Sequence, residues 1–420
     1  MFPEQIEAIY LHQVNEFDHL SLGSDYNPAS TSGPARIYEE RAYFLDGTVY
    51  IGNQADKSIL PWLADVGLSP RELVTVPDKC VFRGLKESPD LLTAVAGKIA
   101  RGARPHFFRT TTLESEFINA LGLSWSDTLS CDPAIAEKIG NKAFLRRFAA
   151  ELNCADVFPP HVILSSGWRV EDISKATWKL TPELRKIKAD KVIVKRTDLA
   201  GGDGCCVWNG NGCGDFQTVN AGRELIVEAF IDPRITITGQ WLIADGKFHY
   251  IGMGKQYQLG FVHQGIIASS SKSSVAVKNL HRMKDMVEPL LTRLVQIGYN
   301  GIIGFDAVYH LETDCLYLTE ANTRTTADTY VYAVAARLGF RPWAVACKII
   351  KPALGITDFR DVKNSLGYLL YQPARENGIA PYMLSGLKLP SGQRRLGLMS
   401  ISTNPGTAEH FLREAESRLC

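Results

Sequence analysis

Two acidic side chains in neighbouring apolar segments carry the most specific chemical signal of the sequence. Asp306 lies in the apolar run 301–308, and Glu320 follows fourteen positions later in a run that continues to Asn322. If these segments pair as antiparallel strands, the three side chains share a face, because alternate residues of a strand point the same way. Two carboxylates and an amide oxygen suit Mg²⁺ that also holds phosphates, so the pattern predicts a metal site.

Arg324 stands two positions beyond Asn322. A guanidinium there could stabilise a transferring phosphoryl group or bind a carboxylate. The alternative is that Asp306 and Glu320 are an ordinary cross-strand pair at a sheet edge. Buried carboxylates are costly without a partner, which favours the metal site.

A glycine-rich loop lies between two predicted strands and contains Gly201, Gly202 and Gly204. Successive backbone amides in such a loop can bind phosphate, although a simple glycine-rich hairpin is the alternative. No Lys-Ser/Thr pair follows the loop, and strands flank it on both sides, which excludes a Walker-type loop and a dinucleotide-binding fingerprint. Lys142 and Lys195 could contact the same phosphates, whereas each taken singly is typical of a solvated surface lysine.

The segment after the next predicted strand could bind a base. Backbone groups of Glu228, Ala229, Phe230 and Ile231 can pair with an adenine edge, and the last two side chains supply apolar cover. The alternative is a buried strand end.

Hydrophobic periodicity predicts the elements that position these residues. An Asp-Gly pair predicts a hairpin over 42–51. An amphipathic helical stretch covers 134–153 with a break at Gly140, and Asn404-Pro405 precedes a final helix. Further strands are expected over 105–109, 161–164, 191–195, 206–208, 225–231, 235–243, 247–253, 302–309 and 316–320, and helices over 90–100, 113–121, 278–297, 326–338 and near 343–350.

Composition excludes several classes of protein. The chain has 420 residues, 45% of them apolar, with 46 basic against 45 acidic side chains. This is the composition of a globular protein of about two to three domains, and it excludes a disordered chain. The charge balance argues against nucleic acid as the main partner. The sequence shows no membrane span and no signal peptide, and its nine scattered cysteines are expected to be reduced thiols, so we predict a cytoplasmic protein.

The order of these features resembles the ATP-grasp family of carboxylate–amine ligases over residues 136–350. Asn141 and Lys142 match an Asp-Lys pair of that family. Lys195 with the glycine loop matches its second nucleotide lysine and phosphate loop. The segment from Glu228 matches its adenine hinge, and the segment from Asp306 to Arg324 is similar to its metal and reaction centre.

The sequence departs from the family pattern at several positions. Asn141 replaces the common Asp, and Gly304 stands where some members carry an arginine. Ile235 occupies the position of a ribose-binding acid, a role that Asp232 could take. His263 and its neighbours replace a lysine that a carboxylase would need, which weakens a carboxylase assignment.

The resemblance implies an α+β multidomain chain with an ATP-grasp fold and an N-terminal pre-ATP-grasp α/β domain. The expected domains are 1–135 (pre-ATP-grasp), 136–223 (small lobe), 224–360 (large lobe with the metal site) and 361–420 (strands and helix completing the fold). Lys142, Lys195 and the glycine loop would bind the phosphates of ATP, residues 228–232 its base and ribose, and Asp306, Glu320 and Asn322 would bind Mg²⁺, with Mn²⁺ as the alternative. Arg324 and Lys195 are the implied catalytic residues.

The implied reaction activates a substrate carboxylate as an acyl phosphate and joins it to an amine, releasing ADP and phosphate. Small-molecule substrates, an amino acid or peptide among them, are expected in a biosynthetic role, with no nucleic-acid or membrane partner and with a homodimer left open. Lys255, His263 and the run 269–274 could line the acceptor pocket or form a flexible surface loop. The alternatives are an ATP-dependent carboxylase, a ligase of another metabolite, and a nucleotide-binding regulator without turnover.

Overall fold

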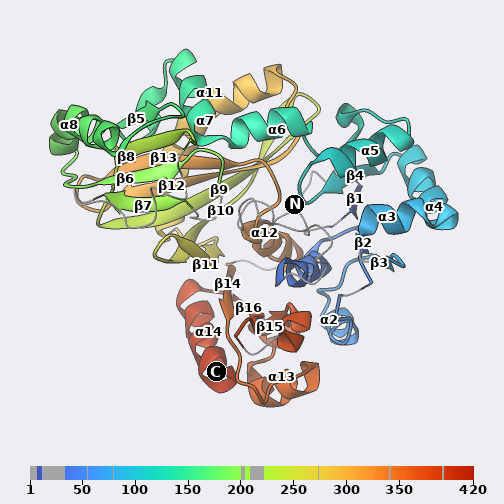
Figure 1. Ribbon diagram of the computed structural model, residues 1–420. Coiled ribbons are helices and arrows are strands. Elements are labelled where there is room, and N and C mark those ends of the chain that lie inside the picture. The colour runs from blue at the N-terminus through green and yellow to red at the C-terminus, as the bar shows by residue number, and fades with distance from the viewer. Residues whose placement is uncertain are drawn as a thin grey trace.

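A computed structural model describes residues 7–11, 34–53, 55–78, 80–199, 204–208, 222–272, 274–339, 342–389 and 392–420. These parts of the chain form three β-sheets with helices packed against them (Figure 1). The mixed architecture confirms the predicted α+β class. None of the helices in these ranges is long and apolar enough to cross a membrane.

The first sheet is parallel and has the order β3-β2-β1-β4. Its strands are β1 (Ala8–Leu11), β2 (Thr48–Ile51), β3 (Glu72–Thr75) and β4 (Arg104–Phe107). The connecting helices are α2 (Leu60–Asp65), α3 (Val81–Lys86) and α4 (Pro89–Ala100), and α5 (Thr112–Ala120) follows β4. Parallel strands need such crossovers, because a two-residue turn cannot join them.

The hairpin predicted over 42–51 is wrong. Residues Pro34–Phe44 form the 3₁₀ helix η3, and the Asp46–Gly47 turn joins this helix to β2. The apolar residues Ala42 to Leu45 are fully buried in the core. They are buried as the end of a helix and the turn after it, and not as a strand paired with β2. A Cβ at Gly47 would lie 2.7 Å from the Ala8 carbonyl oxygen, so the turn needs glycine for close backbone approach.

The predicted break at Gly140 divides the helical stretch into α6 (Pro133–Gly140) and α7 (Lys142–Glu151). Asn141 lies between them and accepts hydrogen bonds from the backbone amides of Ala143 (3.0 Å) and Phe144 (2.9 Å). This N-cap satisfies donors that the first turn leaves open. It makes Lys142 the first residue of α7.

The second sheet is antiparallel and has the order β5-β8-β6-β7. Its strands are β5 (His161–Leu164), β6 (Val192–Arg196), β7 (Cys205–Trp208) and β8 (Leu225–Ala229). Helix α8 (Val170–Lys186) packs an apolar stripe that includes Ile173 and Leu180 against this sheet. Every strand predicted between 161 and 231 is therefore confirmed, within one to two residues at its ends.

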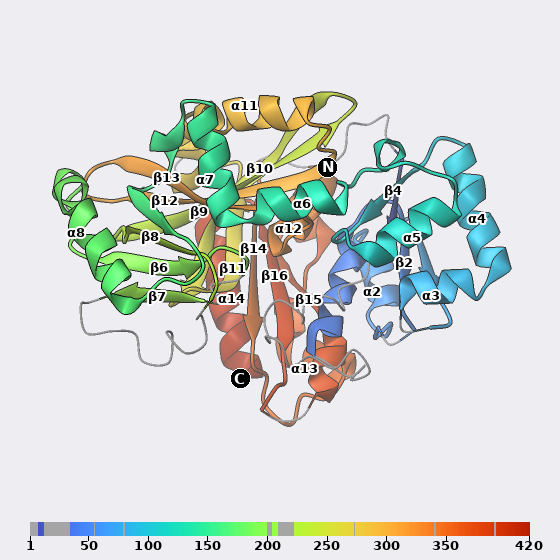
Figure 2. The same ribbon diagram turned by 45° about the horizontal axis from the view of Figure 1, so that its top comes forward.

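The third sheet has eight antiparallel strands in the order β13-β12-β9-β10-β11-β14-β16-β15. Figure 2 shows the first and second sheets on opposite sides of it. Its strands are β9 (Arg234–Ala244), β10 (Lys247–Leu259), β11 (Val262–Ser269), β12 (Gly301–His310), β13 (Cys315–Asn322), β14 (Ala344–Ile350), β15 (Gly378–Tyr382) and β16 (Leu396–Ser402). Its helices are α10 (Val275–Lys278), α11 (Leu280–Gln296), α12 (Ala327–Arg337), α13 (Phe359–Leu366) and α14 (Pro405–Leu419).

The helix predicted near 343–350 is wrong, because these residues form β14 between β11 and β16. Val345, Ile349 and Ile350 are β-branched and favour a strand, and the inner position of β14 buries most of it. The helix expected over 326–338 is confirmed as α12. The helix after Asn404-Pro405 is confirmed as α14, with Asn404 as its N-cap.

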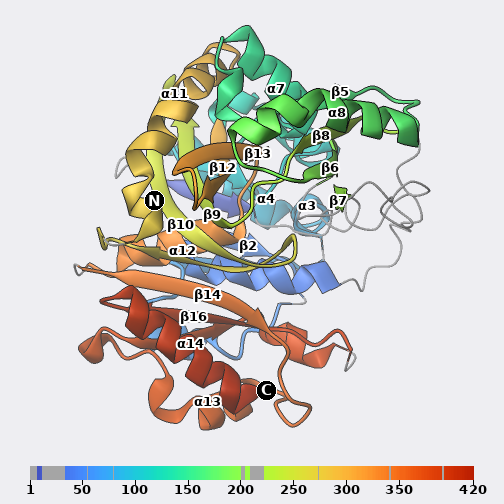
Figure 3. The same cartoon turned by 90° about the vertical axis from the view of Figure 1, so that its left-hand side faces the viewer.

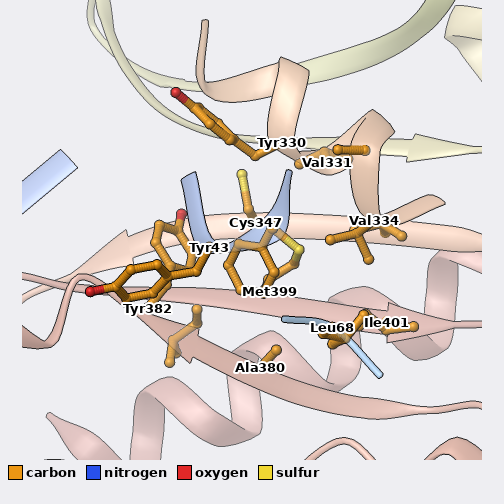
Figure 4. Packing of buried hydrophobic residues seen from close by; sticks show 14 of the residues in the cluster. Tyr43, Leu68, Tyr330, Val331, Val334, Cys347, Ala380, Tyr382, Met399 and Ile401 are labelled. Atoms are coloured by element: carbon orange, nitrogen blue, oxygen red, sulfur yellow. The ribbon is translucent and has the colours of Figure 1, made fainter. Parts of the chain in front are cut away.

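One hydrophobic core joins the first sheet to the third. Figure 4 shows side chains of η3, α12, β14, β15 and β16 packed together, among them Tyr43, Tyr330, Tyr382 and Met399. Helix α14 packs on the opposite side of β14 and β16 (Figure 3). These contacts fix η3 beside α12.

The expectation that all cysteines are reduced is wrong at Cys206, which is disulfide-bonded. The thiols of Cys80, Cys131, Cys154, Cys205, Cys315, Cys347 and Cys420 are free. Scattered spacing carries no pairing signal, so the sequence did not predict this bond.

Candidate active site

The two lysines singled out from the sequence lie at one pocket and are nearly buried, at 5% exposure for Lys142 and 8% for Lys195. The Nζ atom of Lys142 lies 2.9 Å from the Glu320 carboxylate and also donates to the Leu199 carbonyl. Lys195, on β6, pairs with Glu228 on β8. The interpretation of both as solvated surface lysines is wrong, because each is buried in an ion pair.

Glu228 forms a buried ion pair with each of two cations. Arg146 Nη2 lies 2.5 Å from one carboxylate oxygen, and Lys195 contacts the other. Burial disfavours the charged carboxylate, but the two cations outweigh it and hold the pKa of Glu228 below its usual value. Arg146 also donates to the carbonyls of Lys142 (2.9 Å) and Thr319 (3.1 Å), so it ties α7 to β13.

The pocket lies between the second and third sheets, because its lining combines residues of β6 and β8 with residues of β9, β10, β12 and β13. Phe230 and Phe261 pack edge to face at 6.3 Å between ring centres, and the Arg234 guanidinium stacks 4.6 Å from Phe230. The pocket is lined by Lys142, Pro159, Ile193, Lys195, Cys205, Glu228, Ala229, Phe230, Ile231, Arg234, Thr236, Gln258, Phe261, Asp306, Val308, Thr319 and Glu320.

The predicted antiparallel pairing of the carboxylate strands is confirmed. Asp306 on β12 lies directly opposite Glu320 on β13, and Gly304 lies opposite Asn322. The register shifts after the Asp306–Glu320 pair, where Thr319 on β13 is the extra residue of a bulge. Because of the alternation along β13, Glu320 and Asn322 share a face with Asp306.

The surroundings shift the pKa values of the two carboxyl groups in opposite directions. Burial and the neighbouring Glu320 raise the pKa of Asp306 well above its usual value. Burial also opposes ionisation of Glu320, but Lys142 outweighs it and lowers the pKa of Glu320 to about 2. One carboxyl group of the pair therefore loses its proton more readily than usual, and the other holds its proton more strongly.

Hydrogen bonds connect the carboxylate pair to Asn322 and Arg324. The Asn322 amide donates to Asp306 Oδ2 at 3.1 Å, and Gln256 on β10 donates to Oδ1 at 3.1 Å. Arg324 Nη1 donates to the Asn322 side-chain oxygen at 2.6 Å. Burial, reinforced by the nearby Arg109, lowers the pKa of Arg324 to about 10, so the guanidinium keeps its charge at neutral pH.

The residues at this centre fit a divalent cation. Asp306, Glu320 and Asn322 offer only oxygen ligands from side chains, which is the donor set of Mg²⁺ sites that also bind phosphate. Two carboxylates facing each other across a strand pair repel unless a cation or a proton lies between them. No cluster of three or more His, Cys, Asp or Glu residues suited to a metal occurs in the described residues, so an amide and the substrate would complete the ligand set.

Some predicted site residues lie elsewhere. Asp232 is exposed next to Pro233 and does not line the pocket. Arg234 lies in the pocket wall instead. Gly204 is at the β6–β7 turn, where its φ of 66° suits glycine, whereas Gly201 and Gly202 lie outside the described residues.

Sequence reasoning missed several residues of the site. Arg146 stands four positions after Lys142 on the same helix face, a spacing that could have been recognised. Gln256, Thr236 and Gln258 alternate along β9 and β10 and form hydrogen bonds next to Asp306. No local motif marks them, because strand pairing alone brings them to the site.

Comparison with known structures identifies the fold. Biotin carboxylase from Campylobacter jejuni matches with a TM-score of 0.56 and 12% identity, covering 99% of this chain and 91% of that one. L-amino acid ligase from Bacillus licheniformis matches with a TM-score of 0.52 and 12% identity, covering 99% and 98%. The chain also matches pyruvate carboxylase from Rhizobium etli, with a TM-score of 0.54 and 13% identity over 98% of this chain, and spans 37% of that protein.

These likenesses show that the chain has the ATP-grasp fold. No protein-family model matches the sequence, and neither does any curated protein. At such low identity the comparisons define the fold alone, and the chemistry has to be argued from the residues of this chain.

Proposed function

We propose that the protein is an ATP-dependent ligase that activates a carboxylate as an acyl phosphate and joins it to an amine. The observation that carries the proposal is that one pocket contains two buried lysines and, at its end, the Asp306–Glu320 carboxylate pair. Transfer of a γ-phosphoryl group requires cations that bind the phosphates and acidic side chains that bind Mg²⁺. The Campylobacter jejuni neighbour was solved as a β,γ-ATP complex, which supports ATP as the nucleotide.

Each residue has a distinct role in this proposal. Phe230, Ile231 and the backbone after β8 hold the base, and Lys195 and Lys142 contact the phosphates. Mg²⁺ held by Asp306, Glu320 and Asn322 would neutralise charge on those phosphates. Arg324 stabilises the anionic oxygens of the carboxylate and phosphoryl groups as they meet, because its forked donors suit both. Positioning and electrostatics suffice for this chemistry, without a protein nucleophile.

A nucleotide-binding regulator is the competing class. Such a protein needs a base pocket and phosphate contacts, but it gains nothing from a guanidinium linked to the metal ligands. The Arg324–Asn322–Asp306 chain of hydrogen bonds therefore favours an enzyme.

The test is an ATP-consumption screen over pairs of amino acids, with mass spectrometry of the products and Glu320→Gln as the inactive control. We expect ADP, phosphate and a new amide for at least one pair. An arm with bicarbonate and no amine tests the carboxylase alternative. Nucleotide binding without turnover in every arm would contradict the ligase proposal and favour the regulator.

A further inference from the structure

A row of side-chain hydrogen bonds runs along the wall of the pocket and ends at Asp306. Thr236 Oγ1 on β9 donates to Gln258 Oε1 on β10 at 3.0 Å, and Gln258 Nε2 donates to Gln256 Oε1 at 3.2 Å. Gln256 Nε2 donates in turn to Asp306 Oδ1 at 3.1 Å. Thr236, Gln258 and Asp306 line the pocket. The row therefore connects another part of the pocket wall with a proposed metal ligand.

The carboxylate at the end of the row fixes the orientation of both side-chain amides. When Asp306 is ionised, as a cation ligand has to be, its oxygens only accept hydrogen bonds, so Gln256 must present its nitrogen to them. The oxygen of Gln256 then faces Gln258, which must donate with its own nitrogen and accept from the Thr236 hydroxyl. The observed contacts follow this order at every step.

An amide holds each of the two oxygens of the Asp306 carboxylate. Asn322 Nδ2 on β13 donates to Oδ2 at 3.1 Å, whereas Gln256 on β10 donates to Oδ1. Donors on both oxygens restrict rotation of the carboxylate about its Cβ–Cγ bond. Each oxygen keeps a second lone pair that can bind a cation. A divalent cation would therefore meet Asp306 in a fixed orientation.

The members of the row differ in how they can influence Asp306. Gln256 touches it directly and is not part of the described pocket lining, so its effect on a ligand in the pocket has to pass through Asp306. Thr236 stands two residues before Thr238, the residue directly opposite Asp306, which is about 7 Å along the strand. The Thr236 hydroxyl therefore reaches Asp306 only through the two amides.

We propose that Gln256 is a positioning residue of the metal centre and that Gln258 and Thr236 act through it. Gln256 holds the Asp306 carboxylate in the orientation that binds a divalent cation, and the rest of the row holds Gln256. Hydrogen-bonding partners of a metal ligand typically change the metal affinity by 10- to 100-fold when they are removed. The inference rests on the nucleotide-and-metal part of the proposed function and adds the residues that orient one of its ligands.

The experiment measures how much Mg²⁺ contributes to nucleotide binding. Isothermal titration with β,γ-methylene-ATP is carried out at saturating Mg²⁺ and again in EDTA, and the ratio of the two Kd values gives the coupling between metal and nucleotide. The variants are Gln256→Met, Gln258→Met, Thr236→Val and Thr236→Ser. Gln393→Met before β16 and Thr292→Val on α11, both at exposed positions, are the matched controls.

We expect Gln256→Met to lower this ratio by at least ~10-fold and to leave the Kd in EDTA unchanged. Gln258→Met and Thr236→Val should lower the ratio less, because Gln256 can still reach Asp306, and Thr236→Ser should keep the wild-type ratio. A ratio in Gln256→Met equal to that of Gln393→Met, or an equal change of both Kd values, would overturn the proposal. If Gln256→Met fails to fold, a wild-type ratio in Gln258→Met, whose position is exposed, would overturn it.

Direct metal binding separates this inference from the proposed function. A metal effect that depends on Gln256, in a protein that turns over no pair of substrates, would support the row and contradict the ligase. If wild type binds no nucleotide, the proposed function fails, and titration with Mn²⁺ alone still tests the row. Weaker Mn²⁺ binding by Gln256→Met, with Gln393→Met unchanged, would support it. Equal Mn²⁺ binding by both, or none by wild type, would overturn it.

Discussion

Lys142 and Glu320 form an ion pair with 2.9 Å between Nζ and Oε2, although one begins α7 and the other lies on β13. The pair joins the proposed phosphate contact to the proposed metal ligand. Each charge offsets the cost of burying the other. Binding of Mg²⁺ and ATP would offer both groups a new partner, the phosphates for Lys142 and the cation for Glu320, so nucleotide and metal should bind together rather than singly.

Replacing Glu320 tests the metal centre. Glu320→Gln keeps the shape of the side chain but removes a charged oxygen, and we expect turnover to fall by at least ~10²-fold, the usual effect of losing one charge-stabilising group. The exposed Glu312→Gln on the β12–β13 turn is the matched control. Wild-type turnover of Glu320→Gln at saturating Mg²⁺ and ATP would contradict the assignment.

Replacing the lysines tests the phosphate contacts. Lys142→Ala and Lys195→Ala should each weaken nucleotide binding or turnover, because both remove a buried cation from the pocket wall. Lys278→Ala, at an exposed position of α10, should leave both unchanged. Nucleotide titration and steady-state kinetics measure these effects. Equal effects at all three positions would contradict the assignment of Lys142 and Lys195 as phosphate contacts.

Arg324→Lys tests the mechanism. It keeps the charge but loses the forked donors, so the variant should bind ATP normally and turn over ~10²–10³-fold more slowly. Hydroxylamine should trap a hydroxamate of the carboxylate substrate in wild type, with ADP as the nucleotide product. Formation of AMP and pyrophosphate would show adenylation instead of acyl-phosphate chemistry.

Replacing Arg146 tests the buried charge network. Arg146→Met leaves Glu228 with one cation in a site where its exposure is 1%, and we expect the free energy of unfolding to fall by ~3–5 kcal/mol. Adding Glu228→Gln to that variant leaves Lys195 as a buried cation without its carboxylate and should lower the free energy of unfolding further. Urea denaturation of the two variants, with the exposed Arg360→Gln as control, measures the difference, and a double variant more stable than the single one would contradict this account.

The buried Glu40 makes stability depend on pH. Burial raises the pKa of Glu40 from 4.5 to about 7, against hydrogen bonds from the Asp56 and Ser385 amides. Between these values the folded chain binds more protons than the unfolded chain, so stability falls as pH rises from 4.5 to 7 and is level above. The expected loss is about 3 kcal/mol at most, and Glu40→Gln should abolish this slope. Urea denaturation from pH 4.5 to 8 checks it, and an unchanged slope in the variant would rule out Glu40 as its source.

The parts of the site that lie within one segment could be predicted from the sequence. Alternation of apolar residues placed Asp306 and Glu320 on one face, and the helix break at Gly140 placed Lys142 at a helix start. These predictions depend only on local periodicity and on one hairpin. Their agreement with the fold explains why the order of motifs resembled the ATP-grasp family.

Features that depend on distant segments could not be predicted. The packing of η3 against α12 joins segments far apart in the sequence, although the Asp-Gly signal of the same region favoured a hairpin. The stretch over 344–350 pairs between two strands that come from 262–269 and 396–402, and that pairing overrides its weak helical pattern. Asp232 was chosen by its spacing from Glu228, and in the structure it is exposed and does not line the pocket.

The eight-stranded sheet also has a consequence for how the chain acquires its site. The strands that carry the two carboxylates lie at one end of a sheet whose other end is β16 and β15. During synthesis, β9 to β13 emerge long before these strands, and β11 would expose a row of unpaired backbone groups until β14 pairs with it. Such a nascent chain would be prone to aggregate, so expression of this protein should depend on chaperones or low temperature more than its balanced composition indicates.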